Sequence, residues 1–168
     1  MTRPTGRDLA RNAIFVILVP GVVGGLIPLL ITRYESRDWG ALAVPVAVAA
    51  WALIAGGAAV LLYGVWRFAA EGRGTPSPTA PTERLVVAGP YRYVRNPMYL
   101  AVGAVIAGQA LLFGSWALVL YLGLFAIAVA LFVILYEEPT LRRTFGAEYE
   151  AYCAQVPAWW PRRPPTRS

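Results

Sequence analysis

The sequence predicts an all-α integral membrane protein with four transmembrane helices, organised as a single domain over residues 1–168. Composition is the first reason: 58% of the residues are hydrophobic and the mean hydropathy is +0.54, above the range of ordinary soluble domains. The second reason is that long uncharged stretches alternate with short charged ones. Each stretch has at least the length that one crossing of a bilayer requires.

The ionisable residues exclude several classes of site. All 15 basic residues are arginines, there is no histidine, and Cys153 is the single cysteine. A metal site built on histidine or cysteine clusters is therefore not expected, and neither is a histidine general base or an internal disulfide. We expect no metal and no nucleic acid as partners, because the net charge of +6 comes from arginines that alternate with membrane segments. Cys153 itself is expected to be structural.

The first predicted span is residues 12–32, a run of 21 residues without a charge. Pro20 and Pro28 interrupt this run. Proline is tolerated in a transmembrane helix when neighbouring helices satisfy the carbonyl groups that it leaves without a partner. A cleaved signal peptide is the alternative, but the apolar run is longer than a signal core and lacks a clear cleavage site.

The second predicted span is residues 40–66, within 28 uncharged residues that carry aromatic side chains near both ends. Such aromatic residues are typical of the membrane interface. Ala52 and Gly56 form a pair of small residues one turn apart, which predicts close approach of another helix. A cytoplasmic loop over residues 67–95 follows, with a proline- and glycine-rich stretch that cannot sustain a helix.

The last two spans are predicted from 41 uncharged residues, Asn96 to Tyr136, with Gly114 and Ser115 near the midpoint. This length is about twice that of one crossing. We therefore expect spans at 96–114 and 116–136, joined in a tight helical hairpin. A single long helix is the alternative, but it would leave about 30 Å of apolar surface in water.

The third span is expected to begin at Asn96 and Pro97. An asparagine side chain can accept from the first free N–H groups of a helix, and proline suits the first helical position because it has no N–H to leave unpaired. The positive end of this helix, beside Arg92 and Arg95, predicts an anion site.

The arginines also predict orientation. Three precede the first span, two lie in the first loop, five in the second, none in the third, and five follow the last span. Positive residues favour the cytoplasmic side, so both termini are expected there, in the inner or plasma membrane if the protein is bacterial. The loop 67–95 and the tail 137–168 then share one side of the membrane, and Asn96 and Glu137 lie at the same depth.

The tail begins with two glutamates, Glu137 and Glu138, at the negative end of the fourth helix, where acidic side chains are unfavourable. They are either solvated or paired with Arg142 and Arg143, or they face a cationic or hydroxyl-bearing ligand. A helix with one apolar face is expected next. That face consists of Leu141, Phe145, Tyr149, Tyr152 and Val156.

Taken in order, these motifs resemble a family. They are Gly89-Pro90-Tyr91, Arg95-Asn96-Pro97-Met98-Tyr99, Glu137-Glu138, and Phe145-Gly146-Ala147-Glu148-Tyr149. The pattern is similar to the integral-membrane methyltransferases that include isoprenylcysteine carboxyl methyltransferase and phospholipid (phosphatidylethanolamine) methyltransferase. The resemblance covers about residues 67–161 and implies an all-helical fold without a Rossmann domain. It also implies that S-adenosyl-L-methionine binds at the cytoplasmic ends of the last two spans and that a hydrophobic acceptor reaches the site from the lipid bilayer.

The resemblance further implies site residues. Contacts to the cofactor fall on Glu83, Arg84, Leu85, Val86, Tyr91, Asn96, Pro97, Met98, Tyr99 and Glu137. From the residues themselves, we expect catalytic roles for Arg95 and Glu138, and Arg92 or Arg95 is a candidate for holding a carboxylate or phosphate of the cofactor or the substrate.

The chain departs from the family pattern at two positions. Asn96 stands where the family usually has histidine, and it cannot carry a proton near neutral pH. Val133 stands where the isoprenylcysteine branch has an arginine that is thought to meet the acceptor carboxylate. The acceptor is therefore expected to be a lipid amine, a thiol or another hydrophobic nucleophile rather than a prenylcysteine carboxylate. The rival functions are a non-enzymatic membrane scaffold and a membrane reductase related to sterol reductases.

Overall fold

The computed structural model describes residues 20–33, 35, 37–71 and 85–162, with the side chains of 65 and 67–71 left out. Within these ranges the regular structure is entirely helical, as predicted. The helices are a π-helical turn at Val22–Leu26, α2 (Ile27–Thr32), a 3₁₀ turn at Gly40–Leu42, α3 (Ala43–Glu71), a 3₁₀ turn at Gly89–Arg92, α4 (Pro97–Phe113), α5 (Trp116–Phe132), a π-helical turn at Val133–Glu137, α6 (Glu138–Phe145) and α7 (Ala147–Gln155).

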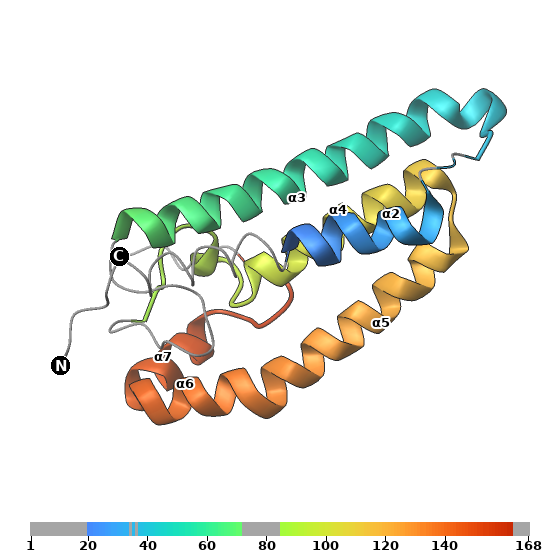
Figure 1. The fold of residues 1–168 in the computed structure, drawn as a ribbon. Helices are drawn as coiled ribbons and strands as arrows, with labels where there is room; N and C mark the ends of the chain where they lie inside the picture. Colours follow the sequence, from blue (N-terminus) through green and yellow to red (C-terminus); the bar gives the residue numbers. More distant parts are fainter. Residues whose placement is uncertain (1–19, 34, 36, 72–84, 163–168) are drawn as a thin grey trace.

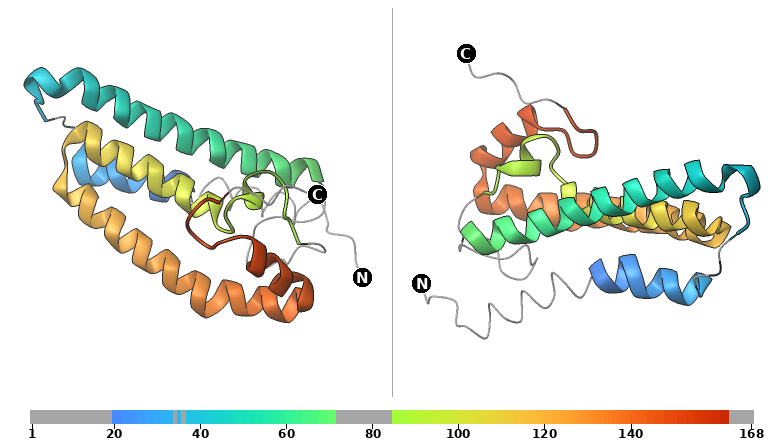
Figure 2. Two further views of the ribbon diagram at one scale, coloured as in Figure 1. Left: turned by 180° about the vertical axis from the view of Figure 1, so that it is seen from behind. Right: turned by 90° about the horizontal axis from the view of Figure 1, so that it is seen from above.

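Three long helices form the body of the molecule. α3 lies alongside α4, and α5 runs back from the far end of α4 (Figure 1). α2 packs against α4 and α5. α4 and α5 diverge away from the turn that joins them, and the segment 89–96, α6 and α7 gather at that wider end, as the views in Figure 2 show. This end holds most of the polar contacts described below.

The proline in the first apolar helix is accommodated as predicted. Pro28 has no N–H to donate to the carbonyl of Gly24 one turn earlier. Gln109 of α4 donates from Nε2 to that carbonyl oxygen at 2.6 Å, and Tyr121 of α5 donates to the neighbouring Val23 oxygen at 2.9 Å. Two other helices therefore satisfy carbonyls in the π-helical turn before the proline.

Close packing of α3 on α4 depends on glycines, but the predicted pair was wrong. A Cβ on Gly56 would meet nothing within 4 Å, whereas one on Gly57 would lie 2.5 Å from the Ala101 carbonyl oxygen. On α4, a Cβ on Gly108 would lie 2.7 Å from the Ala50 oxygen. The contact face of α3 therefore includes Gly57, because side chains 100° apart around a helix point in different directions.

α4 and α5 are connected by only Gly114 and Ser115. Gly114 adopts φ 59°, a left-handed conformation that ends α4 and that glycine tolerates. Ser115 then caps α5 by accepting from the Leu118 N–H at 3.4 Å. The break in the uncharged stretch therefore lies where the sequence places it.

Two long helices continue past their predicted limits. α3 extends to Glu71, so residues 67–71 of the predicted loop are helical; no glycine or proline occurs between residues 65 and 71 to end the helix earlier. α5 continues through the π-helical turn Val133–Glu137 into α6. Pro139 is accepted there because it lies just after the π-helical turn, where the regular ladder of α-helical hydrogen bonds is already interrupted.

The predicted amphipathic tail helix is divided in two. Gly146, with φ 50° and ψ −123°, separates α6 from α7. The predicted apolar face is consequently shared between two helices: Tyr149 and Val156 are buried, whereas Leu141, Phe145 and Tyr152 are half-buried. A glycine that leaves the helical conformation redirects the chain although the 3.6-residue pattern runs through it.

The outer faces of the long helices are apolar. Leu120, Leu124, Ile127 and Leu131 of α5 are all exposed, and so are several large apolar residues of α3. Within the described residues, two helical stretches, Gly40–Gly64 and Trp116–Phe145, are long and apolar enough to cross a membrane. Val22–Thr32 and Pro97–Phe113 are shorter apolar helices, and residues 12–19 of the predicted first span lie outside the described part.

Candidate functional site

The start of α4 and the π-helical turn that follows α5 meet through side chains. Tyr99, in the first turn of α4, donates a hydrogen bond of 2.8 Å to Oε2 of Glu137. Glu137 is half-buried, and in the described part of the chain no arginine forms an ion pair with it. The result is a carboxylate of fixed orientation whose charge is not balanced by any cation among the described side chains.

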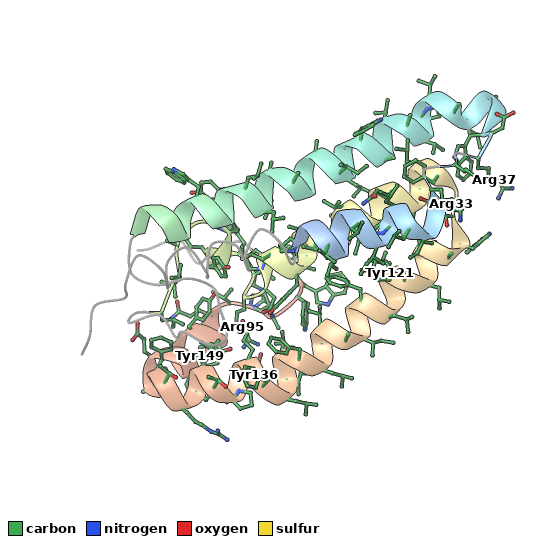
Figure 3. All side chains as sticks on the ribbon, in the orientation of Figure 1. Arg33, Arg37, Arg95, Tyr121, Tyr136 and Tyr149 are labelled. Carbon is green, nitrogen blue, oxygen red and sulfur yellow. The ribbon has the colours of Figure 1, made fainter. Side chains whose placement is uncertain are left out.

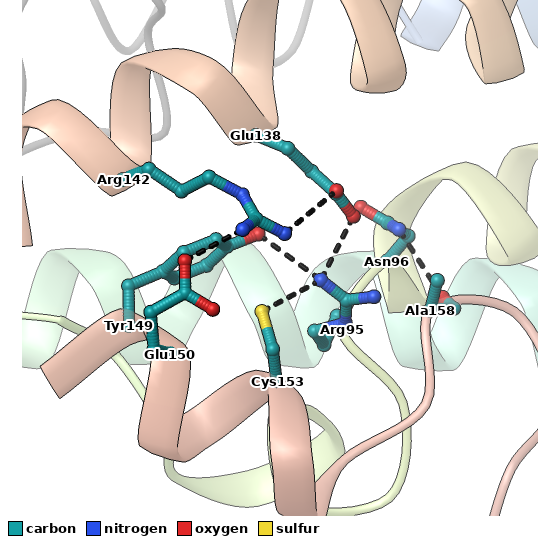
Figure 4. Close-up of polar contacts among 8 residues, drawn as sticks. All are labelled: Arg95, Asn96, Glu138, Arg142, Tyr149, Glu150, Cys153 and Ala158. Atoms are coloured by element: carbon teal, nitrogen blue, oxygen red, sulfur yellow. Dashed lines mark hydrogen bonds and ion pairs between the residues drawn. The ribbon is translucent and has the colours of Figure 1, made fainter. Parts of the chain in front are cut away.

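The neighbouring Glu138 is held by a different partner. Arg95 Nη1 lies 2.8 Å from Glu138 Oε1, and it also donates to the Tyr149 hydroxyl at 3.3 Å and to Cys153 Sγ at 2.9 Å (Figure 4). Arg142 extends the network, with Nη2 at 3.8 Å from Glu138 Oε2 and Nη1 at 2.6 Å from Glu150 Oε1. The two adjacent glutamates therefore lie in different environments: among the described side chains, Glu138 is paired with cations and Glu137 is not.

Arg95 is a largely buried cation. Its side chain is 15% exposed, and its Nε is the only buried guanidinium nitrogen without a hydrogen-bond partner among the described residues. Burial lowers the pKa of Arg95, but the charge of Glu138 and the hydrogen bond with Tyr149 outweigh this effect and raise the pKa above its ordinary value. Arg95 is therefore a permanent positive charge inside the network, at the end of the molecule opposite Arg33 and Arg37 (Figure 3).

The C-terminal segment fastens the loop that precedes α4. The Arg95 N–H donates to the Pro157 oxygen at 2.9 Å, and the Arg162 N–H donates to the Tyr93 oxygen at 3.0 Å. The buried Asn96 side chain donates from Nδ2 to the Ala158 oxygen at 3.1 Å. We call residues 156–162 the strap, because they hold residues 93–96 by three hydrogen bonds.

This arrangement corrects the predicted role of the Asn96 side chain. Asn96 is the residue before α4, and Pro97 is its first residue, as predicted. However, the side chain makes no capping hydrogen bond. The amide instead donates to the Ala158 carbonyl oxygen of the strap, which needs a hydrogen-bond donor. The sequence does not predict this partner, because Ala158 lies 62 positions after Asn96.

The 3₁₀ turn Gly89–Arg92 has two different sides. Tyr91 lies close enough to Glu137 for the carboxylate charge, after burial itself, to raise the pKa of Tyr91 above its ordinary value. The Tyr152 hydroxyl of α7 donates to the Tyr91 oxygen at 2.7 Å. The residues around Tyr91 line an open pocket of about 540 Å³. Its lining is Tyr63, Ala88, Gly89, Pro90, Arg92 and Tyr93.

The predicted cofactor residues fall into three groups. Tyr91, Asn96, Pro97, Tyr99 and Glu137 come together at the wide end of the molecule, as described above. Met98 belongs to the same turn but faces α3, where a Cβ on Gly64 would lie 3.4 Å from its Cε. Leu85 and Val86 are half-buried in the segment before the 3₁₀ turn, and Glu83 and Arg84 lie outside the described residues.

Sequence reasoning missed the contribution of α7. Tyr149 and Tyr152 were expected only as members of an apolar face, yet their hydroxyls contact Arg95 and the Tyr91 carbonyl. Cys153 was expected to be structural, and its Sγ is a neighbour of Arg95. The one available signal was that tyrosines, rather than leucines, occupy an apolar face, since a buried tyrosine hydroxyl needs a polar partner.

A comparison with known families tests the resemblance. The model of the family described as phospholipid methyltransferase matches residues 45–148, which is more than half of the chain. The chain belongs to the phospholipid methyltransferase family. The matched region extends from α3 to the start of α7 and contains the 3₁₀ turn, the first turn of α4 and both glutamates. Membership confirms the predicted family and supports methyltransferase as the class of activity.

The other comparisons give no match. No curated protein and no solved structure is significantly similar to the chain.

Proposed function

We propose that the protein transfers the methyl group of S-adenosylmethionine to a hydrophobic or lipid-like acceptor at the membrane. The observation that carries the proposal is Glu137: a half-buried carboxylate, fixed by Tyr99 and without an ion-pair partner among the described residues. An uncompensated buried carboxylate is costly. A ligand that brings a positive charge or hydroxyl donors removes that cost.

The donor set near Glu137 suits this cofactor. S-adenosylmethionine offers an ammonium, a sulfonium and ribose hydroxyls, all of which a carboxylate can attract or accept from. Tyr91 and Tyr99 add aromatic surface beside it, and the N–H groups in the first turn of α4 have no partners within the helix. These N–H groups would hold the carboxylate or ring acceptors of the cofactor, and Glu137 would hold its cationic or hydroxyl groups.

When bound, the cofactor supplies an activated methyl group on sulfur, so little acid–base chemistry is required of the protein. The residues described here would contribute orientation and exclusion of water, which are the main sources of rate in a direct displacement. Tyr99 would fix the carboxylate, and the strap would fix the loop at 93–96. Glu137 and Glu138 are the nearest carboxylates for removing a proton from an amine acceptor.

Arg95 and Glu138 remain the proposed catalytic pair, with their ion pair as the source of a fixed local charge. Each neutralises the other at 2.8 Å, and Tyr149 and Cys153 limit the motion of the guanidinium. This rigid pair would help to position Glu137, which is the residue before Glu138. It would also hold the loop that contains Arg95, because the loop and both glutamates lie at the same packed end of the molecule.

Val133 favours an acceptor other than a prenylcysteine carboxylate. Its side chain is 1% exposed, so it packs inside the helices and offers no charge to an acceptor. An amine, a thiol or another nucleophile on a hydrophobic molecule fits this position better than a carboxylate that would need a cation there.

The topology that accompanies this function has four crossings and cytoplasmic termini. The proposal rests on the arginine distribution and on the two apolar helices α4 and α5, which return the chain to the end that it left (Figure 1). Reporter fusions at the N-terminus, after Asp38, at Thr79, at Gly114 and at Ser168 are expected to read in, out, in, out, in. A reading of Thr79 on the outer side contradicts this topology.

The activity itself is tested by calorimetry on the full-length protein in detergent. We expect binding of S-adenosylmethionine and S-adenosylhomocysteine and no binding of reduced nicotinamide cofactors. Binding of the nicotinamide alone would support the reductase alternative, and binding of neither would support the scaffold.

A further inference from the structure

The pocket beside the 3₁₀ turn is separate from the residues assigned to the cofactor. None of its six lining residues is among the predicted cofactor contacts. Tyr91 does not line the pocket; it lies near Glu137, and its carbonyl oxygen accepts from the Tyr152 hydroxyl. The pocket lining therefore shares no residue with the group around Glu137.

The pocket has the character of an anion site. Arg92 is the one charged residue in its lining; it is exposed, and none of the carboxylates that the structure describes pairs with it. Arg95 differs, because its charge is already matched by Glu138. A free guanidinium recognises phosphate or carboxylate oxygens by paired hydrogen bonds.

The pocket also lies at the level where an apolar helix ends. Tyr63 forms one wall, and the uncharged stretch of the second apolar segment ends three residues later, at Trp66, before Arg67. Tyrosine is typical of the membrane interface, where lipid headgroups lie. An anion bound by Arg92 can therefore remain attached to an acyl chain that stays in the bilayer.

We infer that this pocket binds the anionic group of the methyl acceptor and that Arg92 is the residue that recognises it. The inference rests on the proposed methyl transfer and adds to it a place and a residue: the phosphate of a lipid acceptor would lie in this pocket, on Arg92. The aromatic walls, Tyr63 and Tyr93, would cover the adjoining apolar part. A pocket of about 540 Å³ falls within the range that small-molecule sites occupy, about 300–1,000 Å³.

The inference is tested by binding, so that it does not depend on turnover. Two fluorescent lipids with the same acyl chain are titrated against the full-length protein in neutral detergent: a lysophosphatidic acid and the matching monoacylglycerol, which lacks the phosphate. We expect the wild type to bind the phosphate-bearing lipid at least about tenfold more tightly, the effect of one hydrogen bond to a charged group. Equal affinities for the two lipids overturn the inference.

Three variants assign the preference to its residue. Arg92→Gln is expected to abolish the preference, and Arg92→Lys to keep part of it. Arg143→Gln is the matched control, because Arg143 is exposed, lies outside the pocket lining and removes the same charge; it should keep the full preference. If Arg143→Gln loses as much as Arg92→Gln, general surface charge explains the result and the pocket does not.

Two further arms complete the design. Excess inorganic phosphate that displaces the lipid shows that the anion alone holds the site, whereas failure to displace it shows that the chain is required.

Calorimetry with S-adenosylhomocysteine, run in parallel on Arg92→Gln, should give wild-type affinity. If the unmodified protein does not bind S-adenosylhomocysteine, the proposed function is refuted. If it binds S-adenosylhomocysteine but shows no preference for the phosphate-bearing lipid, only the inference about Arg92 is refuted.

Discussion

The Tyr99 hydroxyl lies 2.8 Å from Glu137 Oε2, although 38 positions separate the two residues. This hydrogen bond joins the first turn of α4 to the π-helical turn Val133–Glu137 that follows α5. It closes a loop of chain whose length is set by two helices and a two-residue connection. The same geometry brings Arg95 to Glu138, so two adjacent glutamates are each fixed by a residue that precedes or begins α4.

Glycines on the α3–α4 interface are expected to control folding stability. Gly57→Ala should destabilise the protein by about 1–3 kcal/mol, because the new methyl group would collide with backbone, at 2.5 Å from the Ala101 oxygen. Gly56→Ala is the matched control: its Cβ meets nothing within 4 Å, and alanine favours the helix over glycine. Thermal unfolding in detergent measures both. Equal melting temperatures would contradict the packing described here.

The hydrogen bond from Gln109 to the Gly24 carbonyl should depend on Pro28. Gln109→Leu is expected to cost about 1–3 kcal/mol, because it leaves a buried carbonyl without its partner. In a Pro28→Ala background the restored N–H can bond to that carbonyl, so the same change should cost less. A double-mutant cycle on the free energy of unfolding measures this difference. A smaller cost of Gln109→Leu in the Pro28→Ala background supports the explanation, and an equal cost in both backgrounds shows that Gln109 acts only by filling space.

The contact between Tyr152 and the Tyr91 carbonyl should matter for ligand binding more than for folding. Tyr152→Phe removes a hydrogen bond of 2.7 Å that holds the 3₁₀ turn. We expect cofactor affinity to fall about fivefold, equivalent to about 1 kcal/mol. Tyr121→Phe is the control, since its hydroxyl binds Val23 away from the site; it should lower the melting temperature and leave affinity unchanged. The reverse pattern would contradict the assignment.

Alkaline pH should weaken the fold through α7 and the 3₁₀ turn. Burial first, and nearby acidic groups second, raise the pKa of Tyr91 above its ordinary value, and burial raises the pKa of Tyr152. A group whose folded-state pKa is raised binds its proton more tightly when folded, so stability declines as pH rises past the ordinary tyrosine value of about 10. Melting temperatures across that range, with tyrosine ionisation followed by its ultraviolet absorbance, test the sign. A constant melting temperature would contradict it.

Most of the helical framework could be predicted from the sequence because each helix has a local cause. Pro97 starts α4, Gly114 ends it, and an uncharged stretch lies between. The meeting of Asn96 and Glu137 at one end followed from the lengths of the two helices. The family followed from the order of short motifs, and a family model that covers residues 45–148 confirms it.

The remaining features depend on contacts that no local pattern encodes. Gly146 breaks the tail helix because of its own backbone conformation, φ 50°, although the apolar periodicity continues through it. The Asn96 amide binds the strap, which lies 62 positions later in the chain. Which glycine of α3 contacts α4, Gly56 or Gly57, depends on which face of α3 meets α4. Hydroxyl partners of Tyr149 and Tyr152 likewise arise only when α7 folds back onto the loop before α4.

The measurement that tests the account most directly is the affinity of Glu137→Gln for S-adenosylhomocysteine by calorimetry. The substitution keeps the shape and removes the charge, and Glu148→Gln, at an exposed position of α7, is the matched control. We expect the affinity of Glu137→Gln to fall tenfold or more, which corresponds to about 1.5–3 kcal/mol for a hydrogen bond to a charged partner, while the control and both melting temperatures stay near wild type. Wild-type affinity in Glu137→Gln would show that the carboxylate fixed by Tyr99 does not hold the cofactor.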